Sequence, residues 1–282
     1  MASGYPRVEV YVRGYFAEDS VIRRVANEPV LMLGGGRALL MQAAHPLVAA
    51  GIVGHSGYRE EPLVRLARTM RALYTIVFGT KTQADAAGAA TQRAHAYVRG
   101  RLGDDVGPFL RGTSYAAGDP ELQLWVHATL VDTGIAMYDA CVRRLGEDEK
   151  EGFHREMRMV ARVFGVPEHV LPRTYAEFED YRHALLAGDV LTLGADAHAV
   201  ADIVLDPPVP LPLKPGARAL ARASVGLLPA ELLERYGLRR GIVDRAVLTT
   251  SRLTARRLVG GVWANGREGM PLRLLATLAR AA

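Results

Sequence analysis

Residues 33–79 read LGGGRALLMQAAHPLVAAGIVGHSGYREEPLVRLARTMRALYTIVFG. The first half of this stretch is too apolar for a solvated loop, yet glycines interrupt it repeatedly. It contains two of the eight histidines, His45 and His55. Polar groups that are buried without partners cost several kcal/mol, so histidines in such surroundings need something to bind. This stretch is therefore the first place to look for a bound group.

The second half of the stretch predicts a helix over 62–78. Pro62 suits a first helical turn, and a single apolar stripe follows at helical spacing. Arg65 and Thr69 lie one turn apart on the flanking face, with Arg68 beside them. An arginine and a threonine next to a buried stripe can bind a carboxylate or an oxygen ligand. The alternative is a surface arginine, with the threonine bonded back to its own helix.

Helical patterns recur along the rest of the chain, and no sustained strand alternation occurs. The triple glycine before Arg37 is a weak phosphate-loop signal, and a tight turn allowing close backbone approach is favoured. His45-Pro46 predicts a helix end. The chain is predicted to be all-α, as a single large helical domain. The expected helices cover residues 18–25, 37–44, 62–78, 82–99, 120–145, 147–164, 175–187, 195–204, 217–228, 230–236 and 242–258, and residues 47–53 are a second short apolar segment.

Two of these helices carry further candidate histidines. Thr80 or Thr82 caps helix 82–99. His95 lies on the shoulder of its inner stripe, which consists of Ala84, Ala87, Thr91, Ala94 and Val98. Small neighbours leave room for a large flat group, although a structural histidine is the more common case. His127 shares a face with apolar residues of helix 120–145, so its imidazole is expected to point inward. The polar residues that follow it imply a buried network or a buried ligand.

Composition bounds the class of protein. The 282 residues are 49% hydrophobic and 23% charged, which is an ordinary globular balance. No apolar run approaches the roughly 20 residues that span a bilayer, and the start lacks the core of a signal peptide. The single cysteine, Cys141, excludes an intrachain disulfide and a cysteine-based zinc site. A cytoplasmic protein is predicted. The net charge of +5 comes without a nucleic-acid motif, so no nucleic-acid partner is expected.

Catalytic signatures of hydrolases and of zinc or di-iron enzymes are missing. What remains are inward histidines, arginines that can meet carboxylates, and helices with small faces. This combination suits a haem between helices, with one histidine as axial ligand and arginine on the propionates.

Several motifs in order add a resemblance. They are GGGRALLMQAAHPLVAAGIVGHS (34–56), REEPLVRLARTMRALYTIVFG (59–79), RAHAYVRG (93–100), YAAGDPELQLWVHATLVDT (115–133), FGVPEHVLPRTYAEF (164–178) and LLPAELLERYGL (227–238). Over roughly residues 20–240 the chain resembles the family of MpaB-type oxygenases and the catalytic domain of latex-clearing protein. That family was once known only as a domain of unknown function.

The resemblance implies a globin-like helical core and haem b as the cofactor. The axial iron ligand of the rubber-cleaving members lands on His95, which makes His95 the metal ligand. The motif arginine and threonine of those members correspond to Arg65 and Thr69. Their lysine, which can cap the distal iron position, corresponds to Arg68. His127 matches a further histidine near the haem, and the resemblance leaves open whether His95 or His127 is the axial ligand.

Two departures from the family pattern bear on the chemistry. Arg68 replaces the lysine, and a guanidinium stays protonated, so it is a poor iron ligand. No acidic residue occurs between Glu28 and Glu60, where the rubber-cleaving members have a distal glutamate. His45 and His55 become the candidate acid–base groups, since histidine exchanges protons near neutral pH. Oxidation of a smaller apolar substrate is favoured over cleavage of polyisoprene.

The sequence thus predicts a haem b-dependent oxygenase or related oxidoreductase. Its partners would be a small apolar, isoprenoid-like substrate, O₂ or peroxide, and an electron donor. A non-catalytic helical protein that binds a lipid, a terpenoid or haem is the alternative. Membrane contact, if any, is expected to be peripheral. The predicted organisation is an N-terminal arm (1–20), a helical haem-binding domain (21–258) and a basic C-terminal tail (259–282).

Overall fold

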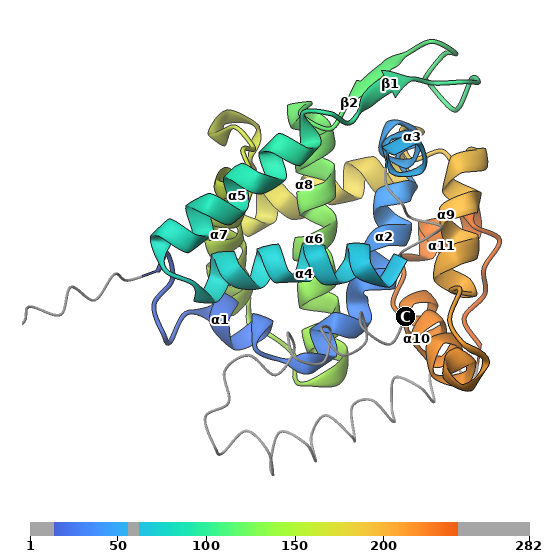
Figure 1. Cartoon of the computed structure of the whole chain (residues 1–282). Coiled ribbons are helices and arrows are strands. Elements are labelled where there is room, and N and C mark those ends of the chain that lie inside the picture. Colours follow the sequence, from blue (N-terminus) through green and yellow to red (C-terminus); the bar gives the residue numbers. More distant parts are fainter. Residues whose placement is uncertain (1–13, 56–61, 242–282) are drawn as a thin grey trace, which may run out of the picture.

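The computed structural model describes residues 14–55 and 62–241 (Figure 1). Within them the chain is all-α, as predicted, apart from one short hairpin. The elements are α1 (Val21–Ala26), η1 (Pro29–Gly34), α2 (Gly35–Ala43), α3 (Pro46–His55), α4 (Pro62–Phe78), α5 (Lys81–His95), β1 (Arg99–Arg101), β2 (Ser114–Ala116), α6 (Pro120–Cys141), α7 (Glu147–Val163), η2 (Glu168–Val170), α8 (Tyr175–Ala187), α9 (Ala195–Leu205), η3 (Leu211–Leu213), α10 (Lys214–Gly226) and α11 (Ala230–Arg235).

Helix α6 runs through the centre of the molecule, and the other helices pack around it (Figure 1). It begins as the sequence predicts, because Asp119 accepts a hydrogen bond from the Glu121 N–H at 2.9 Å and Pro120 occupies the first turn. Residues on all its sides are buried, including Trp125, Val131 and Met137. A helix that is apolar all round needs partners on every face, and this explains its central position.

The glycine run 34–36 allows close packing, as the favoured interpretation predicts. A Cβ at Gly34 would lie 2.6 Å from Thr133 of α6, and one at Gly36 would lie 2.5 Å from the Ser224 hydroxyl of α10. The chain then breaks between α2 and α3 at His45-Pro46, also as predicted.

Helices α4 and α5 form an antiparallel pair joined by a turn at Gly79 (Figure 1). Thr80 begins α5 with a capping box: its hydroxyl accepts from the Gln83 N–H at 3.3 Å, and Gln83 Oε1 accepts from the Thr80 N–H at 2.9 Å. Of the two threonines that the sequence left open, Thr80 is therefore the cap. Gly88 brings α5 against α7, because a Cβ there would lie 2.3 Å from the Val163 carbonyl oxygen.

The prediction that α5 continues to Arg99 is wrong. The helix ends at His95, and residues 99–101 pair in antiparallel register with residues 114–116. Strand pairing takes over because the Val98 carbonyl accepts a hydrogen bond from the Ala117 N–H at 2.8 Å. Gly100 lets the Tyr115 side chain pack across the hairpin, since a Cβ at this position would lie 2.6 Å from the Tyr115 hydroxyl oxygen. The predicted inner position of Ala94 is also wrong, because that residue is exposed.

Other boundaries differ less. Helix α6 ends at Cys141 and not at residue 145, because the Asp139 carboxylate accepts from the Leu145 N–H at 2.7 Å and draws the chain into a loop. Helix α10 begins at Lys214, three residues before the predicted start at 217. The expected helix 242–258, the tail 259–282 and most of the arm 1–20 lie outside the described residues, so the three-part organisation stays a prediction. The globin-like character of the core is likewise still a prediction.

Within residues 14–55 and 62–241, no single helix has the length and apolarity to cross a membrane. The bent pair Pro29–Ala43 and Pro46–His55 would pass by length and composition only.

Candidate functional site

The α4–α5 pair brings Arg65 and His95 to the same end of two antiparallel helices. Arg65 lies 14 residues before Gly79 and His95 lies 16 residues after it. At a rise of about 1.5 Å per residue, both are therefore at a similar distance from the turn. The positive charge of Arg65 also contributes to lowering the pKa of His95, which agrees with their proximity. The fold thus places together two residues that are 30 positions apart in the sequence (95 minus 65).

His95 presents a neutral imidazole. Burial, and after it the charge of Arg65, lowers the pKa of His95 below its usual value, so the ring is unprotonated at neutral pH. The side chain is half-buried, and its Nδ1 is buried without a hydrogen-bond partner among the described residues. A neutral imidazole with an unsatisfied nitrogen is the form in which histidine binds a metal.

Arg65 is a half-buried cation without an ion-pair partner among the described residues. Burial lowers the pKa of its guanidinium, which still stays protonated at neutral pH. An arginine in this state is stabilised by an anion. Thr69 and Arg68, by contrast, are exposed, and the Thr69 hydroxyl donates to the Arg65 carbonyl oxygen at 3.1 Å. In this structure Thr69 therefore makes the bond to its own helix that the sequence left open as the alternative.

His127 points inward from α6, as predicted, and it meets a second buried histidine from α7. Its pKa is lowered to about 3 by burial and then by the charge of His154. His154 is 2% exposed, and burial is the main cause that lowers its pKa to about 4. Both Nδ1 atoms are buried without a hydrogen-bond partner in the described part of the chain. The two imidazoles are thus neutral side chains inside the helical body.

His45 and His55 lie at the two ends of α3, beside the hairpin. The His45 ring is 5.3 Å from the Phe109 ring between centroids, and its Nδ1 accepts from the Leu47 N–H at 3.3 Å. Burial lowers the pKa of His45 to about 4. His55 is exposed, and its ring meets the Tyr115 ring edge-on at 6.1 Å. Among the described residues, no hydrogen bond, ion pair or ring contact joins either histidine to the Arg65–His95 pair.

The polar residues of α6 form a buried network, which is one of the two outcomes that the sequence allowed. Arg37 of α2 donates to Thr133 Oγ1 at 2.7 Å, to Asp132 Oδ2 at 2.5 Å and to the Leu227 carbonyl oxygen at 2.8 Å. Arg182 of α8 lies 3.5 Å from the other Asp132 oxygen. The set therefore binds helices to one another.

Sequence reasoning missed Arg37, Arg182 and His154. A signal for the first was present, because Arg37 is the only Asp, Glu, Lys or Arg between Glu28 and Arg59. A single charge in an apolar segment needs a buried partner. Asp132, the only charged residue between Glu121 and Asp139, is the matching signal. No comparable pattern marks His154, because it lies beside the apolar stripe of a strongly charged helix.

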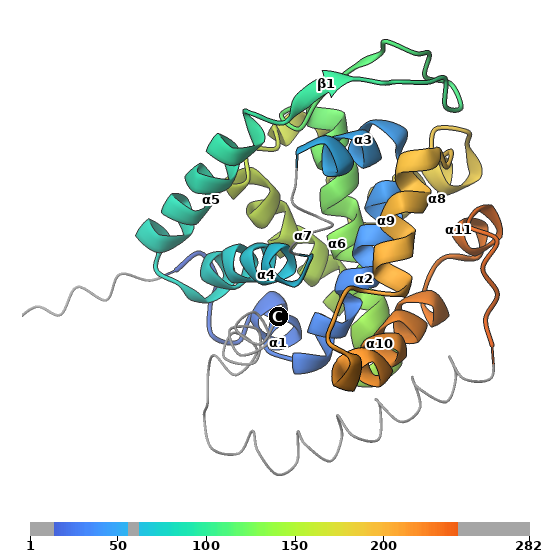
Figure 2. The same ribbon diagram turned by 45° about the vertical axis from the view of Figure 1, so that its right-hand side comes forward.

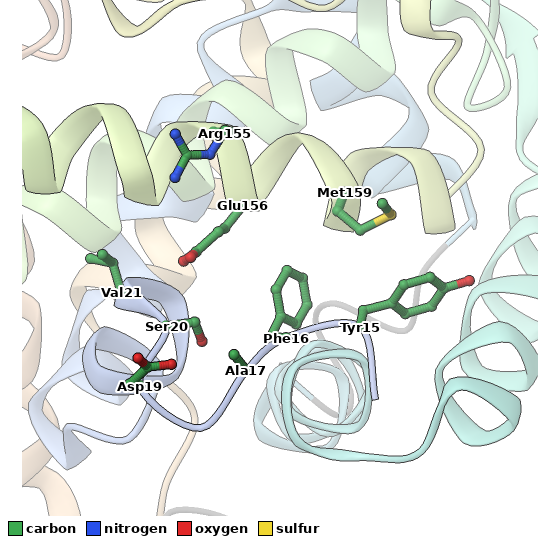
Figure 3. Close-up of a pocket in the computed structure, with 9 residues that line it drawn as sticks. All are labelled: Tyr15, Phe16, Ala17, Asp19, Ser20, Val21, Arg155, Glu156 and Met159. Atoms are coloured by element: carbon green, nitrogen blue, oxygen red, sulfur yellow. The ribbon is translucent and has the colours of Figure 1, made fainter. Parts of the chain in front are cut away.

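Two open surface pockets lie away from these residues. One, of about 430 Å³, is lined by residues 15–21 and by α7, where Met159 stands opposite Tyr15 and Phe16 (Figure 3). The other, of about 510 Å³, runs along the outer side of the α4–α5 turn beside the stacked rings of Tyr74 and Phe78. Neither pocket includes a residue that the sequence singled out for function.

The residues present fit haem b. Iron requires a neutral imidazole nitrogen, and a propionate requires a cation. His95 and Arg65 offer these groups, and neither is paired with another residue of the described segments. Within residues 14–55 and 62–241, no three His, Cys, Asp or Glu side chains are grouped as a metal site. A haem iron, unlike a protein-bound metal ion, needs only one axial side chain from the protein.

Comparison with protein families shows which family the chain belongs to. Residues 22–261 match the model described as the ER-bound oxygenase mpaB/B'/rubber oxygenase, catalytic domain. The chain belongs to this family. The matched region of the mpaB/rubber oxygenase family includes every residue that the sequence singled out, from His45 to His127. Membership supports a general oxygenase activity and confirms the resemblance seen in the motifs.

Two mycobacterial proteins are similar to part of the chain. The chain is 26% identical over 154 residues to the uncharacterized protein Mb2261 of Mycobacterium bovis and equally to the uncharacterized protein Rv2237 of Mycobacterium tuberculosis. Each alignment covers 53% of this chain and 58% of the relative. The chain thus matches little more than half the length of these two relatives. No solved structure matches the chain significantly.

Proposed function

We propose that this protein is a haem b-dependent oxygenase, or a related oxidoreductase, that acts on a small apolar molecule of isoprenoid-like character. The observation that carries the proposal is the pairing of His95 with Arg65. Among the described residues, the Nδ1 atom of this neutral imidazole has no hydrogen-bond partner, and the half-buried arginine beside it has no carboxylate partner. The first group suits iron and the second suits an anion. Family membership supplies the oxygenase class.

Each residue of the proposed site has a task. His95 would hold the haem iron through an unprotonated ring nitrogen. Arg65 would bind a propionate or polarise the oxygen substrate, and Thr69 would offer a hydroxyl one turn away. Arg68 would add positive charge for the propionates, since a guanidinium stays protonated. His127, neutral at physiological pH, lines the interior of the site.

The cofactor supplies iron that activates O₂ or peroxide. Proton transfer would fall to His45 or His55, because the described part of residues 29–59 contains no carboxylate. Burial lowers the pKa of His45 to about 4, and its Nδ1 already accepts from Leu47, so at neutral pH the ring can donate a hydrogen bond from Nε2 but is a poor proton donor. His55 is open to solvent, from which protons can be exchanged. An electron donor and a cytoplasmic location remain part of the proposal.

The test is the absorption spectrum of the purified protein after expression with a haem precursor. We expect a Soret band and one haem per chain. His95→Ala is expected to weaken or shift the band, with partial rescue by added imidazole, and Arg65→Ala to lower haem affinity about tenfold through loss of a charge-assisted contact. His169→Ala, which removes an exposed histidine, is the matched control.

Two outcomes would contradict the assignment. Stoichiometric haem with an unchanged spectrum in His95→Ala would exclude His95 as the iron ligand. If the Soret band weakened or shifted in His127→Ala and not in His95→Ala, the role of iron ligand would pass to His127. Protein that stays colourless and takes up no added hemin would favour the non-catalytic lipid- or terpenoid-binding alternative.

A further inference from the structure

The β1–β2 hairpin projects beyond the helical body in both views of the molecule (Figures 1 and 2). Its inner face is tied to α3, where the Tyr115 hydroxyl donates to the Ala50 carbonyl oxygen at 3.4 Å and Tyr115 is buried. Arg99 and Arg101 pair with Ala116 and Ser114 and are exposed on the opposite face. The alternation along each strand therefore turns two arginines away from the protein.

Exposed apolar side chains accompany these arginines. Tyr97 is 78% exposed and Leu110 is 69% exposed, and they are two of the three large exposed hydrophobic residues within the described chain. Arg101 reaches across the hairpin and donates to the Gly112 carbonyl oxygen at 2.9 Å, which places its guanidinium near Leu110 and Arg111. We call Tyr97, Arg99, Arg101, Leu110 and Arg111 the hairpin patch.

The charges of the hairpin patch are only partly balanced within the described segments. None of its three arginines forms an ion pair with a residue of the described segments. Two acidic residues lie on the same loop, Asp104 and Asp105. Asp105 is turned toward the backbone, where its carboxylate accepts from the Arg111 N–H at 2.5 Å. The outer strand face itself presents Arg99, Arg101, Ser114 and Ala116, with no acidic side chain.

We propose that the hairpin patch docks this protein onto an anionic lipid surface. Arginines that lack partners match lipid phosphates, and the neighbouring leucine and tyrosine can enter the headgroup region, where amphipathic side chains are favoured. A hairpin that projects from the helical body can reach a flat surface. The hairpin begins four residues after His95 (99 minus 95), so docking places the end of α5 close to the bilayer in which apolar molecules dissolve.

The experiment is sedimentation of the full-length protein with vesicles of phosphatidylcholine, with and without phosphatidylglycerol, at low and high salt. We expect binding only to the anionic vesicles and weaker binding at high salt. Arg99→Gln/Arg101→Gln is expected to weaken partitioning about fivefold for each arginine removed. Leu110→Ser is expected to weaken it roughly tenfold through loss of apolar burial.

The chain offers matched controls. Leu211→Ser removes a leucine that is 85% exposed elsewhere, and Arg173→Gln/Arg239→Gln removes the same net charge from exposed positions outside the hairpin. Both controls are expected to bind as the unaltered protein does. Circular dichroism of each variant verifies folding, and its haem content is measured separately, so that failure of docking and failure of the proposed cofactor are distinguished.

Several results would overturn the proposal. These are no sedimentation with anionic vesicles at low salt, full binding by both hairpin variants, or equal losses in the controls. Equally tight binding of the hairpin patch to duplex DNA would show that it recognises phosphate charge in general and not a lipid surface.

Discussion

Arg37 of α2 donates to Asp132 of α6 across 2.5 Å, and the arginine side chain is only 3% exposed. All three kinds of guanidinium nitrogen are used, since Nε, Nη1 and Nη2 bond to Leu227, Thr133 and Asp132 respectively. The contact joins the glycine-rich segment to the central helix and to the chain that leads out of α10. Helix α2 leads directly into the break at His45, so this clamp also anchors the segment that carries this histidine.

Removal of the clamp is expected to destabilise the fold. Arg37→Met leaves the Asp132 carboxylate with only Arg182 at 3.5 Å, so the free energy of unfolding should fall by about 3–5 kcal/mol. Arg173→Ala, which removes an exposed ion pair with Glu177, should cost no more than about 1 kcal/mol. Urea unfolding of both variants compares them. Equal costs would show that Arg37 contributes no more than a surface ion pair, whereas partial recovery in Arg37→Met/Asp132→Leu would support the clamp.

The buried histidines make stability depend on pH in a defined direction. Burial lowers the pKa of His154 from 6.5 to about 4, so the unfolded chain binds a proton that the folded chain rejects. The folded state therefore keeps its full stability, as far as His154 is concerned, above about pH 6.5 and loses part of it as the pH falls toward about 4. For this one residue the loss amounts to roughly 3 kcal/mol.

His154→Phe should remove that part of the pH dependence, because a phenyl ring keeps the contacts with Tyr175 and Phe178 and has no proton to bind. The free energy of unfolding of both proteins, measured between pH 4 and 7, provides the check. The exposed His169 supplies the control, since His169→Gln should leave the profile unchanged. A variant slope as steep as that of the unaltered protein would assign the dependence to other groups.

Helix α5 should be sensitive to its cap. Thr80→Ala removes the hydroxyl that accepts from Gln83, and loss of such a cap costs about 1 kcal/mol. Thr82→Ala changes a neighbouring exposed threonine that is not the cap, so it should be neutral or slightly stabilising. Thermal unfolding of the two variants discriminates between them. The assignment fails if Thr82→Ala is the more destabilising of the two.

Helices and their starts followed from local chemistry, because the signals lie within a few residues of one another. The proline and acid before α6, the apolar stripe of α4 and the residues of α8 (Tyr175–Ala187) all predict the observed elements. Where distant segments compete, local signals mislead. Residues 96–99 continue a helical pattern, yet pairing with residues 114–116 ends α5 at His95.

The sequence by itself determined the all-α class, the main helices and the family, because periodicity, caps and ordered motifs are properties of the chain alone. Only the tertiary structure decided which side chains meet. It placed Arg65 beside His95, used the polar residues of α6 to bind Arg37, and left Thr69 bonded to its own helix. The physical reason is that burial and pairing depend on contacts between segments that are distant in sequence, and no local pattern encodes those contacts.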